Sequence, residues 1–337
     1  MSDFKCIEFY NDKIIFIDQT KLPLEEIYIK TDDYNRIAEA IEKLEIRGAP
    51  AIGVVAAYGL ALAMKNKSSQ KEQEFYNSYE RLRSTRPTAV NLFWALDKMK
   101  LIFEQNKNSE NIYHILLSAA KEVHKDDIEK CEMIAQNGLN IFQKNSNVLT
   151  HCNTGQLATG GDGTALNVIK KGFEKGFVKM VYVDETRPLL QGSRLTAFEL
   201  EKLNIPFKII TDSTAAFLMK NNDVDLVITG ADRIAVNGDT ANKIGTYNLA
   251  VLSNYHRIPF YIAAPTSTID CDCESGEKIK IEIREKSEIL SIKGVKISKE
   301  DYEVYSPAFD LTPNELITGI ITEKKLHKPP YKLNDKD

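Results

Sequence analysis

The amino-acid sequence predicts an α/β protein. A small N-terminal β element plus helices comes first, and a doubly wound, mainly parallel sheet follows. Two observations support this prediction. In the second half of the chain, apolar runs of strand length alternate with helical patterns, an order typical of a parallel sheet with helices on both faces. In the first half, short β-rich runs broken by turn residues precede a series of helical patterns.

The first half begins with three β-rich runs, at 7–10, 14–17 and 26–30. Helical spacing then takes over, and Pro50 occupies a first-turn position that tolerates proline. The predicted helices are 31–45, 51–65, 70–84, 88–105 and 109–143. This half is therefore expected to be mostly helical.

The second half alternates regularly. Strands are predicted at 147–151, 179–183, 207–210, 225–229 and 259–263, and helices at 164–175, 192–203, 213–221 and 242–255. Short strand-like pieces follow within 277–320, with a last helix near 312–321. We expect an N-terminal β-plus-helical domain (1–145), an α/β catalytic domain (146–325) and a loose charged tail (326–337).

Composition narrows the class of protein. The chain has 337 residues, a formal net charge of −4, and five scattered cysteines, an odd number typical of free thiols in a reducing compartment. The acidic balance argues against a nucleic-acid binder. The longest apolar run, 51–64, is too short to span a membrane, and the N-terminus lacks a signal-peptide core. A cytoplasmic protein without nucleic-acid or membrane partners is expected.

Ligands of doubly wound sheets bind at the carboxyl ends of the strands, so the polar residues that follow each apolar run are the candidates. These residues are His151 and Cys152; Asp184, Glu185, Thr186 and Arg187, with Gln191 beyond; Thr211, Asp212 and Ser213; Asp232 and Arg233; and Thr266 and Ser267. They supply a thiol, carboxylates, an amide and cations. Cys152 also fits an ordinary buried thiol, and His151 fits a residue that only orients the strand end.

Phosphate is the predicted ligand class. Arg47 and Gly48 precede a helix whose free N–H groups attract anions, and Asn242 and Lys243 are predicted to open the helix 242–255 in the same way. An ordinary helix–helix turn explains the first stretch equally well. The glycine-rich GGDGT (160–164) is not a P-loop, because no Gly-Lys-Ser/Thr follows, and it fits a turn or a ligand-facing loop.

A metal site is not expected. Cys271 and Cys273 have the spacing of a ligand pair, but the sequence places no second pair and no histidine close to them.

Taken together, several long stretches resemble the methylthioribose-1-phosphate isomerase family, within the wider group that contains the regulatory subunits of translation initiation factor 2B. They are IRGAPAIGVVAAYG (46–59), RPTAVNLFWALD (86–97), THCNTGQLATGGDGTAL (150–166), DETRPLLQGSRLTAFEL (184–200), ITGADRIAVNGDTANKIGTYNLA (228–250) and PAFDLTPNELITGIITE (307–323). The resemblance covers nearly the whole chain, in order.

The resemblance implies a Rossmann-like second domain, a homodimer and an enzyme of methionine salvage, and the chemistry of the reaction requires no cofactor. The implied reaction is an aldose–ketose isomerisation of 5-methylthioribose 1-phosphate. Cys152 is the implied catalytic thiol and Asp232 the implied proton donor. The implied substrate-binding residues are Arg47, Gly48, Ala49, Arg86, Gln191, Asn242 and Lys243.

A sugar phosphorylated at C1 cannot open its ring unaided, so an acid must protonate the ring oxygen. Asp232 suits that role if it stays protonated, and the apolar VDLVIT before it favours the neutral form. The hydrogen at C2 must then reach C1. Cys152 either moves it as a proton through an enediol, or the hydrogen moves as a hydride.

Two alternatives stay open at this point. One is an isomerase for a related sugar 1-phosphate, either 5-deoxyribose 1-phosphate or ribose 1,5-bisphosphate, of which the second needs another cationic site. The other is a non-catalytic regulatory subunit of an initiation factor 2B-like complex, because fold alone does not decide function. The presence of Cys152 and Asp232 together with Arg47 and Lys243 favours the enzyme.

Overall fold

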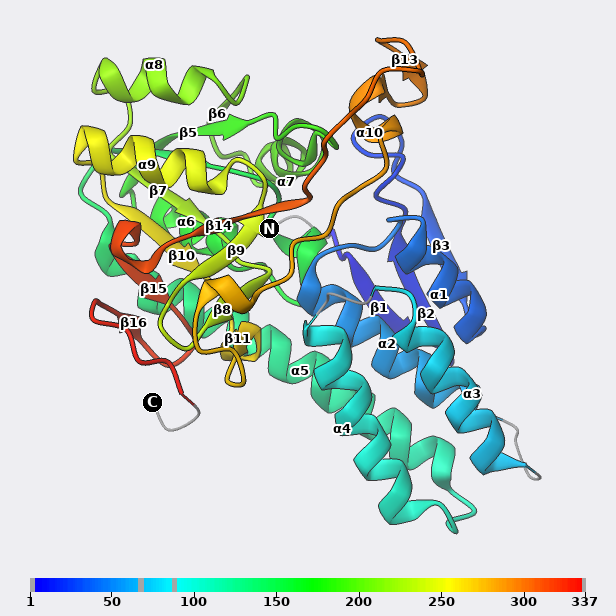
Figure 1. The fold of residues 1–337 in the computed structure, drawn as a ribbon. Coiled ribbons are helices and arrows are strands. Elements are labelled where there is room, and N and C mark those ends of the chain that lie inside the picture. Colours follow the sequence, from blue (N-terminus) through cyan, green and yellow to red (C-terminus); the bar gives the residue numbers. More distant parts are fainter. Residues whose placement is uncertain (1–3, 66–69, 87–89, 335–337) are drawn as a thin grey trace. The chain divides into compact units, whose positions relative to one another are not determined.

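The computed structural model describes residues 4–65, 70–86 and 90–334 (Figure 1). The chain divides into two compact units, which are described separately below. Unit 1 comprises 1–133 and 154–163, and unit 2 comprises 134–153 and 164–337. The segment 154–163, which sequence reasoning placed in the second domain, belongs to unit 1. The boundaries predicted for independent domains stay a prediction, because compactness alone does not show that a unit folds by itself.

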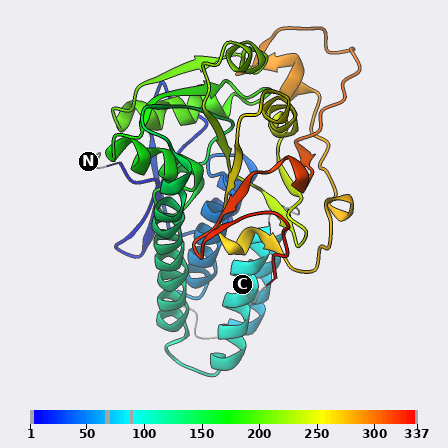
Figure 2. The ribbon, with the colours of Figure 1, turned by 90° about the vertical axis from the view of Figure 1, so that its left-hand side faces the viewer.

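Unit 1 contains the small antiparallel sheet predicted at the N-terminus, in the order β1 (Ile7–Tyr10), β2 (Lys13–Ile17) and β3 (Tyr28–Thr31). Its helices are α1 (Tyr34–Glu42), α2 (Ala49–Ala63), α3 (Lys71–Arg83), α4 (Val90–Asn106) and most of α5 (Ile112–Gly138). Figure 2 shows the long helices of this unit running roughly parallel. Of the predicted helix 88–105, residues 88 and 89 lie outside the described residues.

Helix α2 is the centre of unit 1. It is apolar on all sides and almost entirely buried, which a helix achieves only when other elements cover every face. Gly48 precedes it and Pro50 lies in its first turn, as the sequence predicted.

Unit 2 is built on a seven-stranded sheet with the order β16-β15-β10-β7-β4-β5-β6 (Figure 1). Its strands are β4 (Ser146–Thr150), β5 (Val178–Asp184), β6 (Phe207–Ile210), β7 (Leu226–Thr229), β10 (Phe260–Ala263), β15 (Gly319–Ile321) and β16 (Leu326–His327). All neighbouring pairs are parallel except the pair of β15 with the edge strand β16. The predicted doubly wound, mainly parallel sheet is confirmed.

Helices connect the strands: α6 (Ala165–Glu174), α7 (Ala197–Lys202), α8 (Thr214–Lys220) and α9 (Thr246–His256). Val148 packs in one apolar cluster and its neighbour Leu149 in another, as alternate residues of a strand point to opposite faces. Both faces of the sheet are therefore buried, which explains why the strands are continuous apolar runs.

A second, four-stranded sheet in unit 2 was not predicted. Its order is β11 (Ile269–Asp270), β8 (Arg233–Ala235), β9 (Thr240–Lys243) and β14 (Phe309–Thr312). Two predicted helices are corrected by it. The helix 242–255 begins only at Thr246, because residues 240–243 pair with β14. The helix 312–321 is absent, because its residues form the end of β14, a short 3₁₀ turn (Asn314–Leu316) and β15.

The tail also differs from the expectation of a loose end. Strand β16 pairs with β15, and Tyr331 and Leu333 are buried in unit 2. The Tyr331 hydroxyl donates a hydrogen bond to the Ile317 carbonyl oxygen at 2.8 Å. The described part of the tail is therefore ordered by long-range contacts.

The remaining short elements are the 3₁₀ turns Leu139–Ile141, Gln156–Ala158, Thr266–Thr268 and Gly276–Lys278, helix α10 (Ser287–Leu290), and the hairpin strands β12 (Ser291–Ile292) and β13 (Val295–Lys296). Over residues 4–65, 70–86 and 90–334, no helix combines the length and the apolar character needed to cross a membrane.

Candidate active site

The carboxyl ends of β4 and β7 define the candidate site. From β4 the chain builds the sheet outward through β5 and β6, and it then returns to place β7 on the other side of β4. The strand order reverses between these two neighbours, and such a switch point is where doubly wound sheets bind ligands. Cys152 follows β4, and Asp232 follows β7. The topology therefore brings the two predicted catalytic residues to adjacent strand ends.

The environments of these two residues differ. Cys152 is buried, with 8% of its surface exposed, and its φ is +64°, in the left-handed region. Asp232 is partly buried, and its backbone N–H donates to the Ala241 carbonyl oxygen of β9 at 2.9 Å. The second sheet thus holds the backbone at Asp232, although sequence reasoning did not predict that sheet.

His151 is clamped between two acceptors. Its Nδ1 lies 2.8 Å from Oδ2 of Asp184, and its Nε2 lies 2.8 Å from the Ile244 carbonyl oxygen. A carbonyl only accepts, so Nε2 carries a proton. Burial opposes the charged imidazole, but the hydrogen bond to Asp184 and its negative charge outweigh burial and raise the pKa of His151 to about 9. Burial raises the pKa of Asp184 to about 6. Near neutral pH the two side chains form a buried ion pair.

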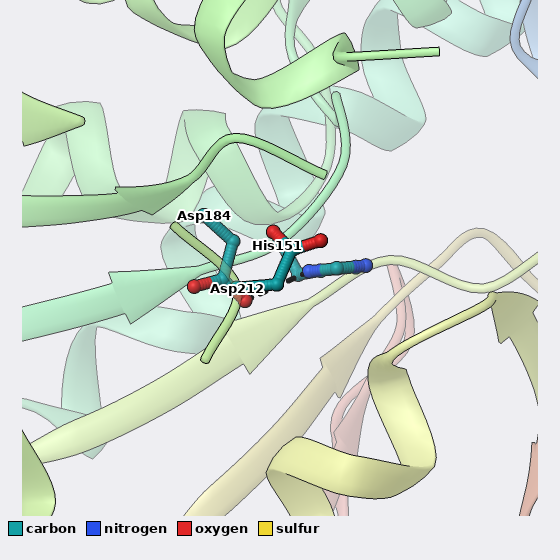
Figure 3. A group of neighbouring side chains, drawn as sticks. All are labelled: His151, Asp184 and Asp212. Carbon is teal, nitrogen blue, oxygen red and sulfur yellow. Dashed lines mark hydrogen bonds and ion pairs between the residues drawn. The ribbon is translucent and has the colours of Figure 1, made fainter. Parts of the chain in front are cut away.

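His151, Asp184 and Asp212 are a group whose ligand atoms all lie within 4.8 Å of one another (Figure 3). The existing hydrogen bonds argue against a metal there. Both His151 nitrogens have partners, and the two Asp212 oxygens accept from the backbone N–H groups of Thr186 and Arg187 at 2.7 and 2.8 Å. We assign these three side chains to holding the strand ends.

Gln191 is buried and precedes a π-helical turn, Gly192–Thr196, that leads into α7. Gly192 is required at this position. An ideal Cβ on it would lie 1.7 Å from the Asp184 carbonyl oxygen, closer than any side chain tolerates. π-Helical turns often occur at functional sites, and this one follows the end of β5.

Asn242 and Lys243 lie on strand β9, and not at the start of a helix as predicted. Both are buried. The Lys243 Nζ donates to the Ala308 carbonyl oxygen at 2.7 Å and lies 4.7 Å from the centroid of the Phe309 ring. Asn242 donates to the Thr246 hydroxyl at 2.9 Å, and so contacts the first residue of α9.

The remaining predicted site residues, Arg47, Gly48, Ala49 and Arg86, belong to unit 1. Gly48 has a φ of +92°, and an ideal Cβ on it would lie 2.3 Å from the Ala158 carbonyl oxygen. The space beside Gly48 is therefore filled by backbone of the 154–163 segment. Arg47 and Arg86 are partly buried, and Ala49 begins α2.

The segment 154–163, which contains most of GGDGT, is tied to unit 1. The Gln19 side chain donates to the Leu157 carbonyl oxygen at 2.7 Å, and the Gly160 N–H donates to Asp127 at 2.6 Å. His124 Nε2 lies 3.0 Å from the Gly160 carbonyl oxygen. These contacts hold the segment as structured backbone rather than as a free turn.

Sequence reasoning missed Thr196 and gave no role to Thr186. Both hydroxyls contact the backbone of Cys152. Thr196 lies within a predicted helix, where nothing in the sequence indicates such a contact. Thr186 could be recognised only as one of the polar residues that follow a predicted strand.

Comparison with known proteins matches residues 45–329 to the Initiation factor 2 subunit family. The methylthioribose-1-phosphate isomerase of Caldicellulosiruptor saccharolyticus is 50% identical over 334 residues, covering 98% of each chain. The chain belongs to the methylthioribose-1-phosphate isomerase branch of this family. The isomerase of Carboxydothermus hydrogenoformans, at 49% identity over 97% of each chain, is another relative in the branch.

Solved structures agree with this family assignment. The 5-methylthioribose 1-phosphate isomerase of Pyrococcus horikoshii OT3 has a TM-score of 0.92 and 42% identity, covering 98% of this chain and 94% of that one. A structure from A. fulgidus described as translation initiation factor eIF-2B, subunit delta, has a TM-score of 0.86 and 38% identity, covering 98% of both chains. The fold class predicted from the sequence is thereby confirmed.

Proposed function

We propose that this protein converts 5-methylthioribose 1-phosphate into 5-methylthioribulose 1-phosphate, an aldose–ketose isomerisation of methionine salvage. The names of relatives 46–50% identical over nearly the full length support an isomerase of this class. The observation that carries the proposal is the placement of Cys152 and Asp232 beyond adjacent parallel strands at the switch point of the sheet.

Asp232 acts first in the proposed mechanism. It gives its proton to the ring oxygen as the bond between C1 and that oxygen breaks, and the phosphate oxygen on C1 stabilises the cationic carbon. Asp232 is then a carboxylate. It later accepts the proton of the C2 hydroxyl, when the C2 carbonyl forms, and so returns to its starting state.

Cys152 acts on the hydrogen that moves. As a thiolate it removes the proton from C2, which leaves an enol between C1 and C2, and it returns that proton to C1. One proton therefore passes from C2 to C1, and a second passes from the C2 hydroxyl to the ring oxygen by way of Asp232, so the overall reaction needs no oxidant and no cofactor. A hydride shift from C2 to C1 is the competing route, and in it Cys152 only shapes the site.

The phosphate is assigned to the cationic groups. The proposed substrate-binding residues are those that the sequence resemblance implies: Arg47, Gly48, Ala49, Arg86, Gln191, Asn242 and Lys243. A lysine and arginines supply the charge and the planar donors that a phosphate dianion requires.

Turnover tests the proposal. The purified protein is mixed with 5-methylthioribose 1-phosphate, and ketose formation is followed by NMR, with 5-deoxyribose 1-phosphate and ribose 1,5-bisphosphate in parallel. If C2-deuterated substrate loses its label to water, proton transfer is supported. Complete retention of the label at C1 is expected for the hydride shift and also for a thiol that returns the same proton, so the activity of C152A separates these two routes.

The second candidate function is a regulatory subunit, favoured by the likeness to the A. fulgidus protein described as an initiation factor subunit. A folded protein that turns over none of these sugars would remove the isomerase proposal and leave this one. The predicted homodimer and cytoplasmic location remain predictions, and light scattering of the purified protein checks the first.

A further inference from the structure

Cys152 has a backbone conformation that its own chemistry does not favour. Its φ is +64°, and the left-handed region is unfavourable for residues other than glycine, asparagine and aspartate. Strain of this kind persists only where the surroundings hold the residue, and it concentrates at functional sites. The question is which groups hold Cys152.

Two threonine hydroxyls contact the two ends of this residue. The Cys152 N–H donates to Oγ1 of Thr186 at 2.9 Å, and the Cys152 carbonyl oxygen accepts from Oγ1 of Thr196 at 2.5 Å. Both threonines are essentially buried, with 0% and 1% of their surface exposed. The peptide groups on both sides of the thiol are thus fixed by side chains from one stretch of chain beyond β5.

Thr186 is itself held from the next strand. Its φ is +66°, a rare value for a β-branched residue. Its N–H donates to Oδ1 of Asp212 at 2.7 Å, and its hydroxyl donates to the Asp184 carbonyl oxygen at 2.9 Å. A chain of hydrogen bonds therefore runs from Asp212, beyond β6, through Thr186, beyond β5, to Cys152, beyond β4.

Thr196 is held by the π-helical turn and by a hydrogen bond from Asn153. It is the last residue of the π-helical turn, whose wider path differs from that of an α-helix. Asn153 Nδ2 donates to the Thr196 hydroxyl at 3.3 Å and to Oε1 of Glu199 at 2.7 Å. The hydroxyl thereby accepts one hydrogen bond and donates another to the Cys152 carbonyl oxygen.

We propose that Thr186 and Thr196 are positioning residues for the isomerisation: their hydroxyls hold the Cys152 backbone in its left-handed conformation and so set the orientation of the thiol toward the substrate. This inference rests on the proposed function. The two threonines act through the Cys152 backbone, so their loss lowers turnover and leaves substrate binding nearly intact. Misplacing a catalytic group by about 1 Å can cost 10²-fold in rate.

The test compares T196V, which keeps the shape and removes the hydroxyl, with T196S, which keeps the hydroxyl. T150V is the matched control, because the Thr150 hydroxyl is buried two residues earlier and donates to the Ile228 carbonyl oxygen at 2.8 Å without contacting Cys152. We expect T196V to lower kcat about 10- to 100-fold with KM changed less than about threefold. T196S and T150V should stay within about threefold of the unmodified protein in both constants.

A second measurement, the rate at which the Cys152 thiol is alkylated, needs no sugar substrate. Iodoacetamide alkylation of Cys152, followed by peptide mass spectrometry, should be at least about threefold faster in T196V than in T150V. Loss of the Thr196 hydrogen bond frees the backbone of Cys152, a residue that is only 8% exposed in the structure, and so makes its thiol more accessible. Equal losses of kcat in T196V and T150V, or no rescue by T196S, would overturn the proposal. If the unmodified protein turns over no sugar, the proposed function alone fails. Equal alkylation rates in T196V and T150V would then also overturn the proposal that the threonines hold the Cys152 backbone.

Discussion

The imidazole Nδ1 of His151 lies 2.8 Å from the Asp184 carboxylate in the core of unit 2, and each residue has 1% of its surface exposed. This pair joins the ends of β4 and β5, the two strands that precede Cys152 and Thr186. Its charge state therefore bears on how firmly both strand ends are held.

The first prediction concerns stability and pH. The pKa of His151 rises from 6.5 to about 9 on folding, so the folded state holds this proton more tightly than the unfolded chain. The resulting stabilisation is fully present below pH 6.5 and is lost as the pH rises through 9. We expect up to about 3 kcal/mol of unfolding free energy to be lost across this window. Urea unfolding between pH 6 and 9.5 measures it.

The double variant H151N/D184N is the control, because it removes the titrating pair without leaving a lone buried charge. Its unfolding free energy should vary less over the same pH range. The raised pKa of Asp184, about 6, affects stability at lower pH: its contribution to the unfolding free energy falls as the pH rises from 3.8 through 6. Equal pH slopes for the two proteins between pH 6.5 and 9 would contradict the assignment.

The second prediction concerns the two catalytic residues. C152A and D232N should each lower kcat by about 10²- to 10⁴-fold, since each removes one general acid–base step. Unfolding free energies should change little by comparison. C271S replaces an exposed thiol and serves as the control, with turnover unchanged. A Cys152 variant that retains more than about a tenth of the activity would favour the hydride route.

The third prediction concerns Gly192. G192A places a methyl carbon against the Asp184 carbonyl oxygen, because an ideal Cβ at this position would lie 1.7 Å from that oxygen. The end of β5 must therefore move. We expect a loss of at least about 3 kcal/mol in unfolding free energy. G176A is the comparison: nothing lies within 4 Å of its Cβ, and only its φ of +72° opposes the change. That variant should lose about 1 kcal/mol, and similar losses in the two would argue against crowding as the cause.

The fourth prediction concerns Lys243. K243M should raise KM for the sugar phosphate about 10- to 100-fold, because a buried charge-assisted hydrogen bond to phosphate is lost. K220M, at an exposed position in the last turn of α8, keeps KM unchanged. Titration calorimetry with inorganic phosphate measures the binding part separately. An unchanged KM in K243M would remove this lysine from the substrate site.

The doubly wound, mainly parallel character of the unit 2 sheet followed from the sequence because its strands are short apolar runs, buried on both faces, with polar residues directly beyond. Cys152 and Asp232 were therefore found as strand-end residues. The second sheet was not found. Residues 240–243 pair with 309–312, and no local pattern reveals a partner so far along the chain.

The start of α9 shows the same limit. Asn242 looked like a helix N-cap by residue type, but Asp310 of β14 accepts from the backbone N–H groups of Gly245 and Tyr247 at 2.7 and 3.1 Å. The cap is supplied from a distant strand. The sequence also did not predict the left-handed backbone of Cys152, because that position holds neither glycine nor proline. It did not predict the π-helical turn, because residues that ordinarily form α-helices surround it.

The division of the chain has a consequence for the order in which the protein forms during translation. Unit 1 is interrupted by 134–153 and resumes at 154–163, so the peptide passes between units three times. Gly48 packs against Ala158, and Gln19 donates a hydrogen bond to Leu157. The N-terminal part of the polypeptide therefore cannot make these contacts until a segment more than a hundred residues later has been synthesised. A ribosome that has just completed Cys152 therefore carries an unfinished first unit, and that unit gains its last segment only after β4 has emerged.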